Sequence, residues 1–304
     1  MKNFSYFNRK NIQTTLQTTE FDILIIGGGI TGAGIALDAA SRGMKVALIE
    51  KNDFASVTSS KSTKLIHGGL RYLKQFDFWL VKEVGTERAI VHKLAPHLVV
   101  PEKMILPLID GGTYGSWLTS IGLKVYDILA SVEDDDKRKM LTKEETLQKE
   151  PLLPENILNG AGFYAEYRTD DARLTIEILK TALNYDAQIL NYAAATEFLY
   201  EEKRVVGAKI SDIISGENFE IKSKYVVNAT GPWVDELRQI NHYGNLYVMW
   251  FCQFCIYWNS DWWHWFFGTK TTKNLIRIWN KSVDWRNNCV LNVCCYCRND
   301  YWLI

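Results

Sequence analysis

The chain has 304 residues and a formal net charge of zero, from 35 basic and 35 acidic side chains. This length leaves room for two domains, and the balanced charge gives no footprint for nucleic acid or an anionic membrane. The first twenty residues contain no continuous apolar segment, so we expect no secretory signal. The longest apolar stretch, from Leu246 to Trp258, is too short for the roughly 20 residues that cross a bilayer. We therefore expect a soluble, cytoplasmic chain with at most peripheral contact with the inner face of the cell membrane.

Before residue 240, helix and strand patterns follow one another along the chain. The pattern predicts a buried strand over residues 21–26, a helix from residue 30 that Gly43 ends, and a second buried strand over 44–50. This order is a parallel β-α-β unit. Further helices are predicted over 76–94, 141–154 and 170–187, and further strands over 102–109, 187–200, 203–210 and 223–229.

After residue 240 the composition changes. All six cysteines and eight of the eleven tryptophans follow it, whereas the last proline is Pro232 and the last glutamate is Glu236. The stretch "MWFCQFCIYWNSDWWHWFF" has no sustained helical or strand period. We interpret residues 241–304 as an aberrant tail, translated out of frame or otherwise not selected for folding. Two Cys-x-x-Cys pairs in it have zinc-knuckle spacing, but we interpret them as accidental and predict no metal.

A glycine motif, G-x-G-x-x-G, joins the first predicted strand to the helix after it. Gly27 permits the tight turn, Gly29 lets the backbone approach a pyrophosphate, and Gly32 lets the helix pack closely on the strand. Glu50, at the end of the next strand, is placed to accept hydrogen bonds from a ribose. The motif therefore predicts a bound dinucleotide. A second strand that enters a small-residue turn, "VVNATG", favours FAD over NAD.

The stretch "TSSKSTKLIHGGLRYL", which begins at Thr58, combines hydroxyls, glycines and cations. Its hydroxyls offer donors and acceptors to pyrophosphate or ribityl oxygens, and its glycine pair lets the backbone approach a flat ring. Its arginine suits a phosphate or carboxylate, because the guanidinium can bond two oxygens at once. The alternative is a capped helix with a solvated basic face.

Together with "RTDDARL" and "VVNATGPWVDEL", these motifs closely resemble the FAD-dependent glycerol-3-phosphate dehydrogenases of bacteria, over about residues 18–240. The resemblance implies an α/β fold: a Rossmann-like FAD-binding domain of the glutathione-reductase or amino-acid-oxidase type, with a second, partly antiparallel substrate domain that is truncated. We expect the FAD-binding domain over 1–95 and 160–240, and part of the substrate domain over 96–159. In that family the chain continues far beyond "VDEL", and we expect the catalytic base there, so no residue is assigned to that role.

The resemblance implies a set of FAD contacts. The glycine motif and Glu50 would hold the adenosine and pyrophosphate, the hydroxyl stretch would line the flavin, Ala195 would meet the adenine through its backbone, and the "GPW" turn would approach the isoalloxazine. The expected contacts are Gly27, Gly29, Ile30, Thr31, Gly32, Glu50, Lys51, Thr58, Ser59, Ser60, Leu65, His67, Gly68, Gly69, Ala195, Gly231, Pro232 and Trp233.

Other residues receive different roles. The resemblance puts Arg71 and Tyr72 at the substrate phosphate. We expect His67 to pack or to support a neighbour rather than to act as the base, and the acids at the start of the 170–187 helix to be structural, because capping and the helix dipole favour them there. Val57 stands where a small residue is expected. A positive φ there would cost on the order of 1–3 kcal/mol.

The reaction that the resemblance implies is oxidation of sn-glycerol 3-phosphate to dihydroxyacetone phosphate, with hydride transfer to flavin N5. Electrons would then pass to a membrane quinone, or to oxygen in the related oxidases. Three alternatives stay open: a non-catalytic FAD-binding fragment, an amino-acid or glycine oxidase, and an NAD-binding module without flavin. No nucleic-acid partner is expected, and a homodimer is left open.

Overall fold

The computed structural model describes residues 4–66, 78–111, 120, 123–124, 137–239 and 290–291. These residues fall into two compact units. The first contains residues up to 62 and from 171 onward, and the second contains residues 63–170. Within the described residues, no helix is both long and apolar enough to cross a membrane.

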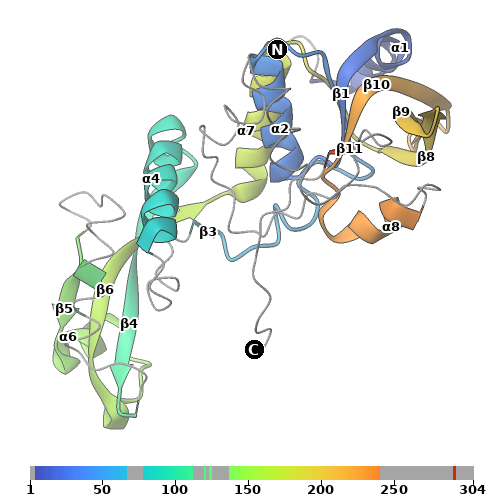
Figure 1. The fold of residues 1–304 in the computed structure, drawn as a ribbon. Helices are drawn as coiled ribbons and strands as arrows, with labels where there is room; N and C mark the ends of the chain where they lie inside the picture. Colours follow the sequence, from blue (N-terminus) through green and yellow to red (C-terminus); the bar gives the residue numbers. More distant parts are fainter. Residues whose placement is uncertain are drawn as a thin grey trace, which may run out of the picture. The chain divides into compact units, whose positions relative to one another are not determined.

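The first unit is built on a seven-stranded sheet (Figure 1). Its parallel core pairs β7 with β2, β2 with β1, and β1 with β10, and the antiparallel strands β9 and β8 extend the sheet beyond β10. A short strand from the distal part of the chain, β11, pairs with β10. In sheet order the bounds are β7 (Gln188–Leu190), β2 (Val46–Ile49), β1 (Glu20–Ile26), β10 (Asn218–Asn228), β9 (Arg204–Asp212) and β8 (Ala193–Glu201), with β11 at Val290–Leu291.

Helices cover both faces of this sheet. Successive side chains of a strand point to opposite faces, so Ile23 and Ile25 of β1 join one apolar cluster and Leu24 and Ile26 join another. The first cluster packs under α2 (Ile30–Ser41) and α7 (Asp171–Asn184), which lie side by side in Figure 1. The second packs under α1 (Arg9–Thr18). The expected α/β fold is confirmed.

The helix α1 and the 3-10 turn before it, η1 (Tyr6–Asn8), were not predicted from the sequence. One apolar pair at helical spacing, Ile12 and Leu16, is buried against the sheet. The Arg9 guanidinium donates to the carboxylate of Asp212, which is fully buried, with an Nε–Oδ2 distance of 2.9 Å. Burial alone would raise the pKa of Asp212. The hydrogen bonds from Arg9 and from two backbone N–H groups outweigh burial and hold this pKa below its usual value.

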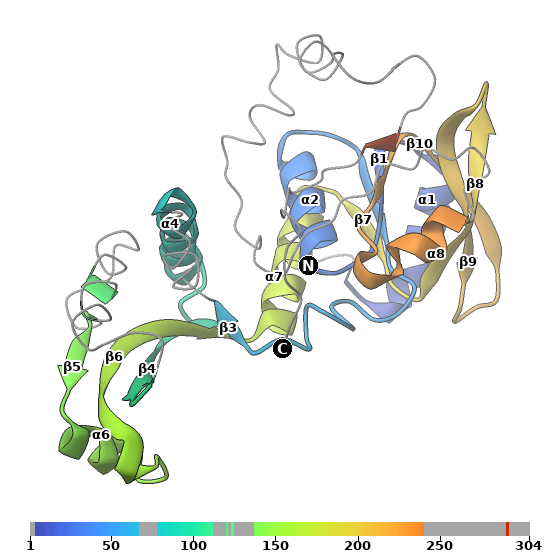
Figure 2. The same ribbon diagram turned by 60° about the horizontal axis from the view of Figure 1, so that its bottom comes forward.

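The second unit is an antiparallel sheet around one long strand, β6 (Leu158–Thr169) (Figure 2). β4 (Val99–Ile109) pairs along one side of β6, and β3 (Leu65–Ile66) and β5 (Lys139–Leu141) pair with separate parts of β6. Its helices are α4 (Phe78–Leu94) and α6 (Lys143–Lys149), and a 3-10 turn, η3 (Glu155–Ile157), leads into β6. The partly antiparallel character expected for the second domain is thus present.

A buried ion pair holds α4 to β6. The Arg88 guanidinium, 1% exposed, donates to Glu166 with an Nη1–Oε2 distance of 3.1 Å, and it lies 4.6 Å from the ring centroid of Tyr167. Burial, with the nearby Glu166 carboxylate as a second cause, raises the pKa of Tyr164 to about 12. The second unit therefore combines a buried ion pair with an apolar cluster of Ile66, Val99 and Tyr167.

Several sequence-based boundaries differ from the structure. Residues 63–95 and 160–170, expected in the FAD-binding domain, belong to the second unit because β6 pairs with β3 and β4 there. β4 runs through Pro101 and Pro107 instead of lying between them, which is tolerated because, among the described strands, β4 pairs with β6 alone. The predicted strand over 187–200 is two strands, β7 and β8, separated by a turn in which Tyr192 has a φ of 51°.

Candidate functional site

The glycine motif forms a tight turn between β1 and α2. Gly27 has a φ of 119°, and a Cβ there would lie 2.3 Å from the backbone oxygen of Ala229. A Cβ on Gly32 would lie 1.9 Å from the Gly27 oxygen. These two positions exclude side chains because the protein itself fills the space. This agrees with the tight turn and the close helix packing that the sequence predicted.

Gly29 differs from the other two glycines of the motif. It is the N-cap of α2, and a Cβ there would meet only the Ser59 hydroxyl, at 3.2 Å. Ser59 accepts the first N–H of the helix, from Ile30, over 2.9 Å. Because the first N–H groups of a helix have no partner within it, they bind anions, and the missing side chain of Gly29 keeps the approach to them clear.

Glu50 follows β2 directly, beside the end of β1, and its side chain is buried. Its carboxylate accepts the backbone N–H of Gly28 over 2.7 Å and that of Asn52 over 2.8 Å. These two bonds fix the carboxylate at the glycine turn. An ionised carboxylate has lone pairs for more than two donors, so Glu50 keeps the capacity to accept from a ribose hydroxyl.

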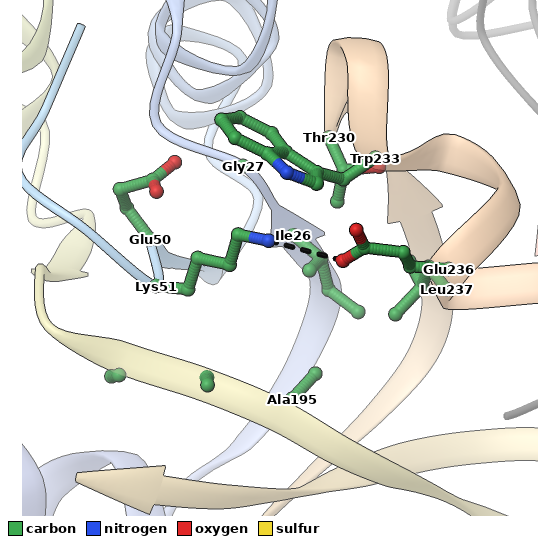
Figure 3. Close-up of a pocket in the computed structure, with 11 residues that line it drawn as sticks. Ile26, Gly27, Glu50, Lys51, Ala195, Thr230, Trp233, Glu236 and Leu237 are labelled. Carbon is green, nitrogen blue, oxygen red and sulfur yellow. Dashed lines mark hydrogen bonds and ion pairs between the residues drawn. The ribbon is translucent and has the colours of Figure 1, made fainter. Parts of the chain in front are cut away.

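A pocket of about 210 Å³ opens beside this turn (Figure 3). Its walls come from the ends of β1 and β2, from the start of β8, and from the segment after β10, which forms the 3-10 turn η4 (Gly231–Trp233) and the short helix α8 (Val234–Gln239). Ligands of open α/β sheets bind at the carboxyl ends of the parallel strands, which is where this pocket lies. It is lined by Ile26, Gly27, Glu50, Lys51, Ala193, Ala194, Ala195, Thr230, Trp233, Glu236 and Leu237.

Lys51 contacts two of the other side chains, and we call the three residues the Lys51–Trp233–Glu236 cluster. The Lys51 ammonium lies 4.2 Å from the centroid of the Trp233 ring, and its Nζ is 3.2 Å from Oε2 of Glu236. Figure 3 shows the ammonium facing both partners. Lys51 and Trp233 were expected as FAD contacts. Glu236 and Leu237 were missed, although they follow the quoted "GPW" turn within one helical turn.

The hydroxyl stretch begins in the first unit. The N–H groups of Ser60 and Lys61 both donate to the backbone oxygen of Val57, which makes one turn of helix-like chain. The φ of Val57 is not positive, whereas Ala55 before the stretch and Lys64 within it have φ values of 58° and 62°. The strain considered for Val57 is therefore absent.

Some of the other residues named from the sequence lie within the part of the chain that the structure describes, and others lie outside it. Asp171 accepts a hydrogen bond from the Ser62 hydroxyl and one from the N–H of Ala172, which is a structural arrangement at the start of α7. Leu65 lies in β3, in the second unit. Of the expected residues, those outside the described ones are His67, Gly68, Gly69, Arg71 and Tyr72, together with all six cysteines. Among the described residues, no cluster of three or more metal-binding side chains is present.

The residues present fit an adenine dinucleotide. The turn supplies free space at Gly29 and helix N–H groups for a pyrophosphate, and the pocket beside it contains the Glu50 carboxylate for a ribose. Ala195, expected to meet the adenine, lines the same pocket.

Comparison with known proteins agrees with this geometry. Residues 22–249 match the family described as FAD dependent oxidoreductase. The chain is 56% identical over 242 residues to the aerobic glycerol-3-phosphate dehydrogenase of Bacillus subtilis (strain 168), covering 80% of this chain and 44% of that protein. The chain thus spans less than half the length of this relative.

Solved structures show the same likeness. The glycerol-3-phosphate dehydrogenase of Bacillus halodurans complexed with FAD is 42% identical, with a TM-score of 0.62, over 77% of this chain and 39% of that one. The glycine oxidase of Bacillus cereus is 25% identical, with a TM-score of 0.50, over 74% of this chain and 59% of that one. The predicted resemblance to bacterial glycerol-3-phosphate dehydrogenases is confirmed.

Proposed function

Because this chain belongs to the family of FAD dependent oxidoreductases, we propose that its first unit binds FAD along the turn between β1 and α2. The glycine turn supports this proposal most directly, since it combines space at Gly29, the N-terminal turn of α2 and a fixed carboxylate at Glu50. In this arrangement the N-terminal end of α2 binds the pyrophosphate and Glu50 accepts from the adenosine ribose. The Ser59 hydroxyl, which accepts the Ile30 N–H at the start of α2, would donate its proton to a phosphate oxygen.

The proposed reaction is the oxidation of sn-glycerol 3-phosphate to dihydroxyacetone phosphate. FAD would supply the redox chemistry there as the acceptor of the C2 hydride, and the hydroxyl proton would pass to a base. The names of the relatives support this substrate. Arg71 and Tyr72 would hold the substrate phosphate, since a guanidinium bonds two phosphate oxygens at once. We further propose a membrane quinone as the final electron acceptor and a position on the inner face of the cell membrane.

Two measurements on the full chain test this function in order. The purified protein should take up FAD and show flavin absorbance, and it should then reduce a dye acceptor when glycerol 3-phosphate is added. Uptake of FAD without turnover of glycerol 3-phosphate would contradict the proposed substrate and leave FAD binding intact. Turnover of glycine in its place would indicate a glycine-oxidase activity.

Arg71→Ala tests the substrate role directly. We expect it to raise the Michaelis constant for glycerol 3-phosphate strongly, because a charged bidentate contact is lost, with flavin content unchanged. Arg173→Ala is the matched control, because the Arg173 side chain is largely exposed and its guanidinium pairs with Glu177 on its own helix. Loss of flavin from Arg71→Ala would show that Arg71 supports the cofactor instead.

A further inference from the structure

The Lys51–Trp233–Glu236 cluster spans the mouth of the pocket. Lys51 comes from the chain just after β2, and Trp233 and Glu236 come from the segment after β10. β2 and β10 are the two parallel neighbours of β1. The cluster therefore closes over the end of β1, where the glycine turn begins.

The pocket has an aromatic wall and a wall of small side chains. Trp233 supplies the aromatic face, and Ala193, Ala194 and Ala195 at the start of β8 supply methyl groups and backbone. In Figure 3 the Lys51 side chain lies between the Trp233 ring and Ala195. The ammonium thus occupies the space in front of the indole face, 4.2 Å from the ring centroid.

The position of Glu50 indicates whether this pocket would bind the adenosine end or the flavin end of FAD. An acid at this position of the fold accepts from the adenosine ribose, and Glu50 lines the pocket together with Trp233. A residue that shares a pocket with the ribose contact lies at the adenosine end. The sequence-based expectation had placed Trp233 at the isoalloxazine, which is the opposite end of FAD.

We propose that Trp233 is a specificity-determining residue that binds adenine, with the base held between the indole and the Ala193–Ala195 segment. Lys51 covers the indole face until the base displaces it. The exchange is favourable because stacking of a whole base on an aromatic side chain contributes more than one cation over a partly exposed ring. The displaced ammonium keeps Glu236 as its partner, so no charge is left unpaired. This inference rests on the proposed FAD binding and extends it.

The test compares ADP with FAD on the full chain. ADP carries the adenine end without the flavin, so calorimetric titration with ADP reports on that end alone. Trp233→Ala should weaken ADP and FAD alike, by about 5- to 150-fold, which is the range for loss of one base–aromatic stack. Trp233→Phe, which keeps an aromatic face, should recover most of both affinities. Trp79→Ala, in the second unit and 79% exposed, should change neither.

Lys51→Met tests the displacement, because it removes the charge and keeps the length of the side chain. ADP association, measured by stopped flow, should become about two- to fivefold faster, as expected when a cation no longer competes for the ring. An unchanged or slower rate would overturn the displacement by Lys51.

The outcomes separate this inference from the proposed function. Wild type that takes up neither FAD nor ADP would overturn both. Wild type that binds both ligands, with Trp233→Ala weakening FAD alone or weakening neither, would overturn the adenine assignment and leave FAD binding standing. Thermal unfolding of each variant without ligand shows whether the variant is folded.

Discussion

Each of the two units is stabilised internally, and the packing that does so differs between them. The first packs α2 onto β1 by leaving side chains out: Gly27 and Gly32 let backbone approach backbone where any Cβ would clash. In the second unit, a buried ion pair between Arg88 and Glu166 joins α4 to β6. The two glycines lie within six consecutive residues of the sequence, whereas the ion pair joins residues 78 positions apart. The comparison shows why the glycine turn could be predicted from a short motif, whereas the Arg88–Glu166 pair could not.

The largest expected effect is in the second unit. Arg88→Met should lower the free energy of unfolding by about 4 kcal/mol, because it leaves the Glu166 carboxylate buried without its cation. The double variant Arg88→Met/Glu166→Leu should recover most of this loss, since both charges are then replaced by apolar groups. Urea unfolding measures both. A loss below about 1 kcal/mol for the single variant would show that the pair does not hold this unit together.

The matching change in the first unit is Gly32→Ala. The new Cβ would lie 1.9 Å from the Gly27 oxygen, so the turn must shift, at a cost of about 3 kcal/mol. Gly29→Ala is the control, because its Cβ would meet only a hydroxyl that can rotate, and we expect a change within about 1 kcal/mol. Equal effects of the two substitutions would remove the distinction between the glycines.

Arg9→Met sharpens the comparison, because it tests an ion pair within the first unit. Asp212 keeps two backbone N–H bonds, so we expect a smaller loss than at Arg88, about 2 kcal/mol. The pKa of Asp212 is lowered in the folded state, so this carboxylate stabilises the fold above its unfolded pKa of about 3.9 and ceases to do so as the pH falls through the lowered value.

Arg9→Met removes one of the causes that lower the pKa of Asp212, so this pKa is higher than in wild type and acid destabilisation should begin at a higher pH. Unfolding curves measured between pH 3 and pH 7 show the shift. An identical acid profile in wild type and Arg9→Met would contradict this role.

The smallest effect is expected at the surface of the first unit. Lys224 donates to Asp22 over 2.7 Å and lowers the pKa of that carboxyl, but the lysine is largely exposed. Solvent screens such a pair, so Lys224→Met should leave the urea midpoint unchanged within error. A clear shift of the midpoint would mean that surface charges contribute to this unit as much as its interior does.

Local patterns in the sequence predicted the β1–α2–β2 unit, the helices α4, α6 and α7, the tight turn at Gly27 and the close packing at Gly32. They did not predict α1, whose apolar signal is the single pair Ile12 and Leu16, nor β6, which is rich in glycine and alanine and lacks a clean alternation. Both elements are fixed by partners far along the chain, through Arg9 in one case and β4 in the other.

In the candidate site, too, some residues could be placed from local sequence patterns and others only from contacts between distant parts of the chain. Glu50 and the glycines could be named from the sequence because the fold places them by local geometry. The expectation that Trp233 approaches the flavin came from a resemblance and stays untested. Trp233 lies in the same pocket as Glu50 because β10 pairs with β1. The spacing of residues along the chain does not predict this pairing.

The central claim is that an adenine dinucleotide lies along the turn between β1 and α2. Its most direct test is the FAD affinity of the folded full chain compared with that of Gly29→Leu, in which a side chain fills the approach to the helix N–H groups. We predict that wild type binds FAD and becomes yellow, while the folded variant stays colourless. A folded wild type that takes up no FAD, or a Gly29→Leu variant that binds it equally well, would contradict the claim.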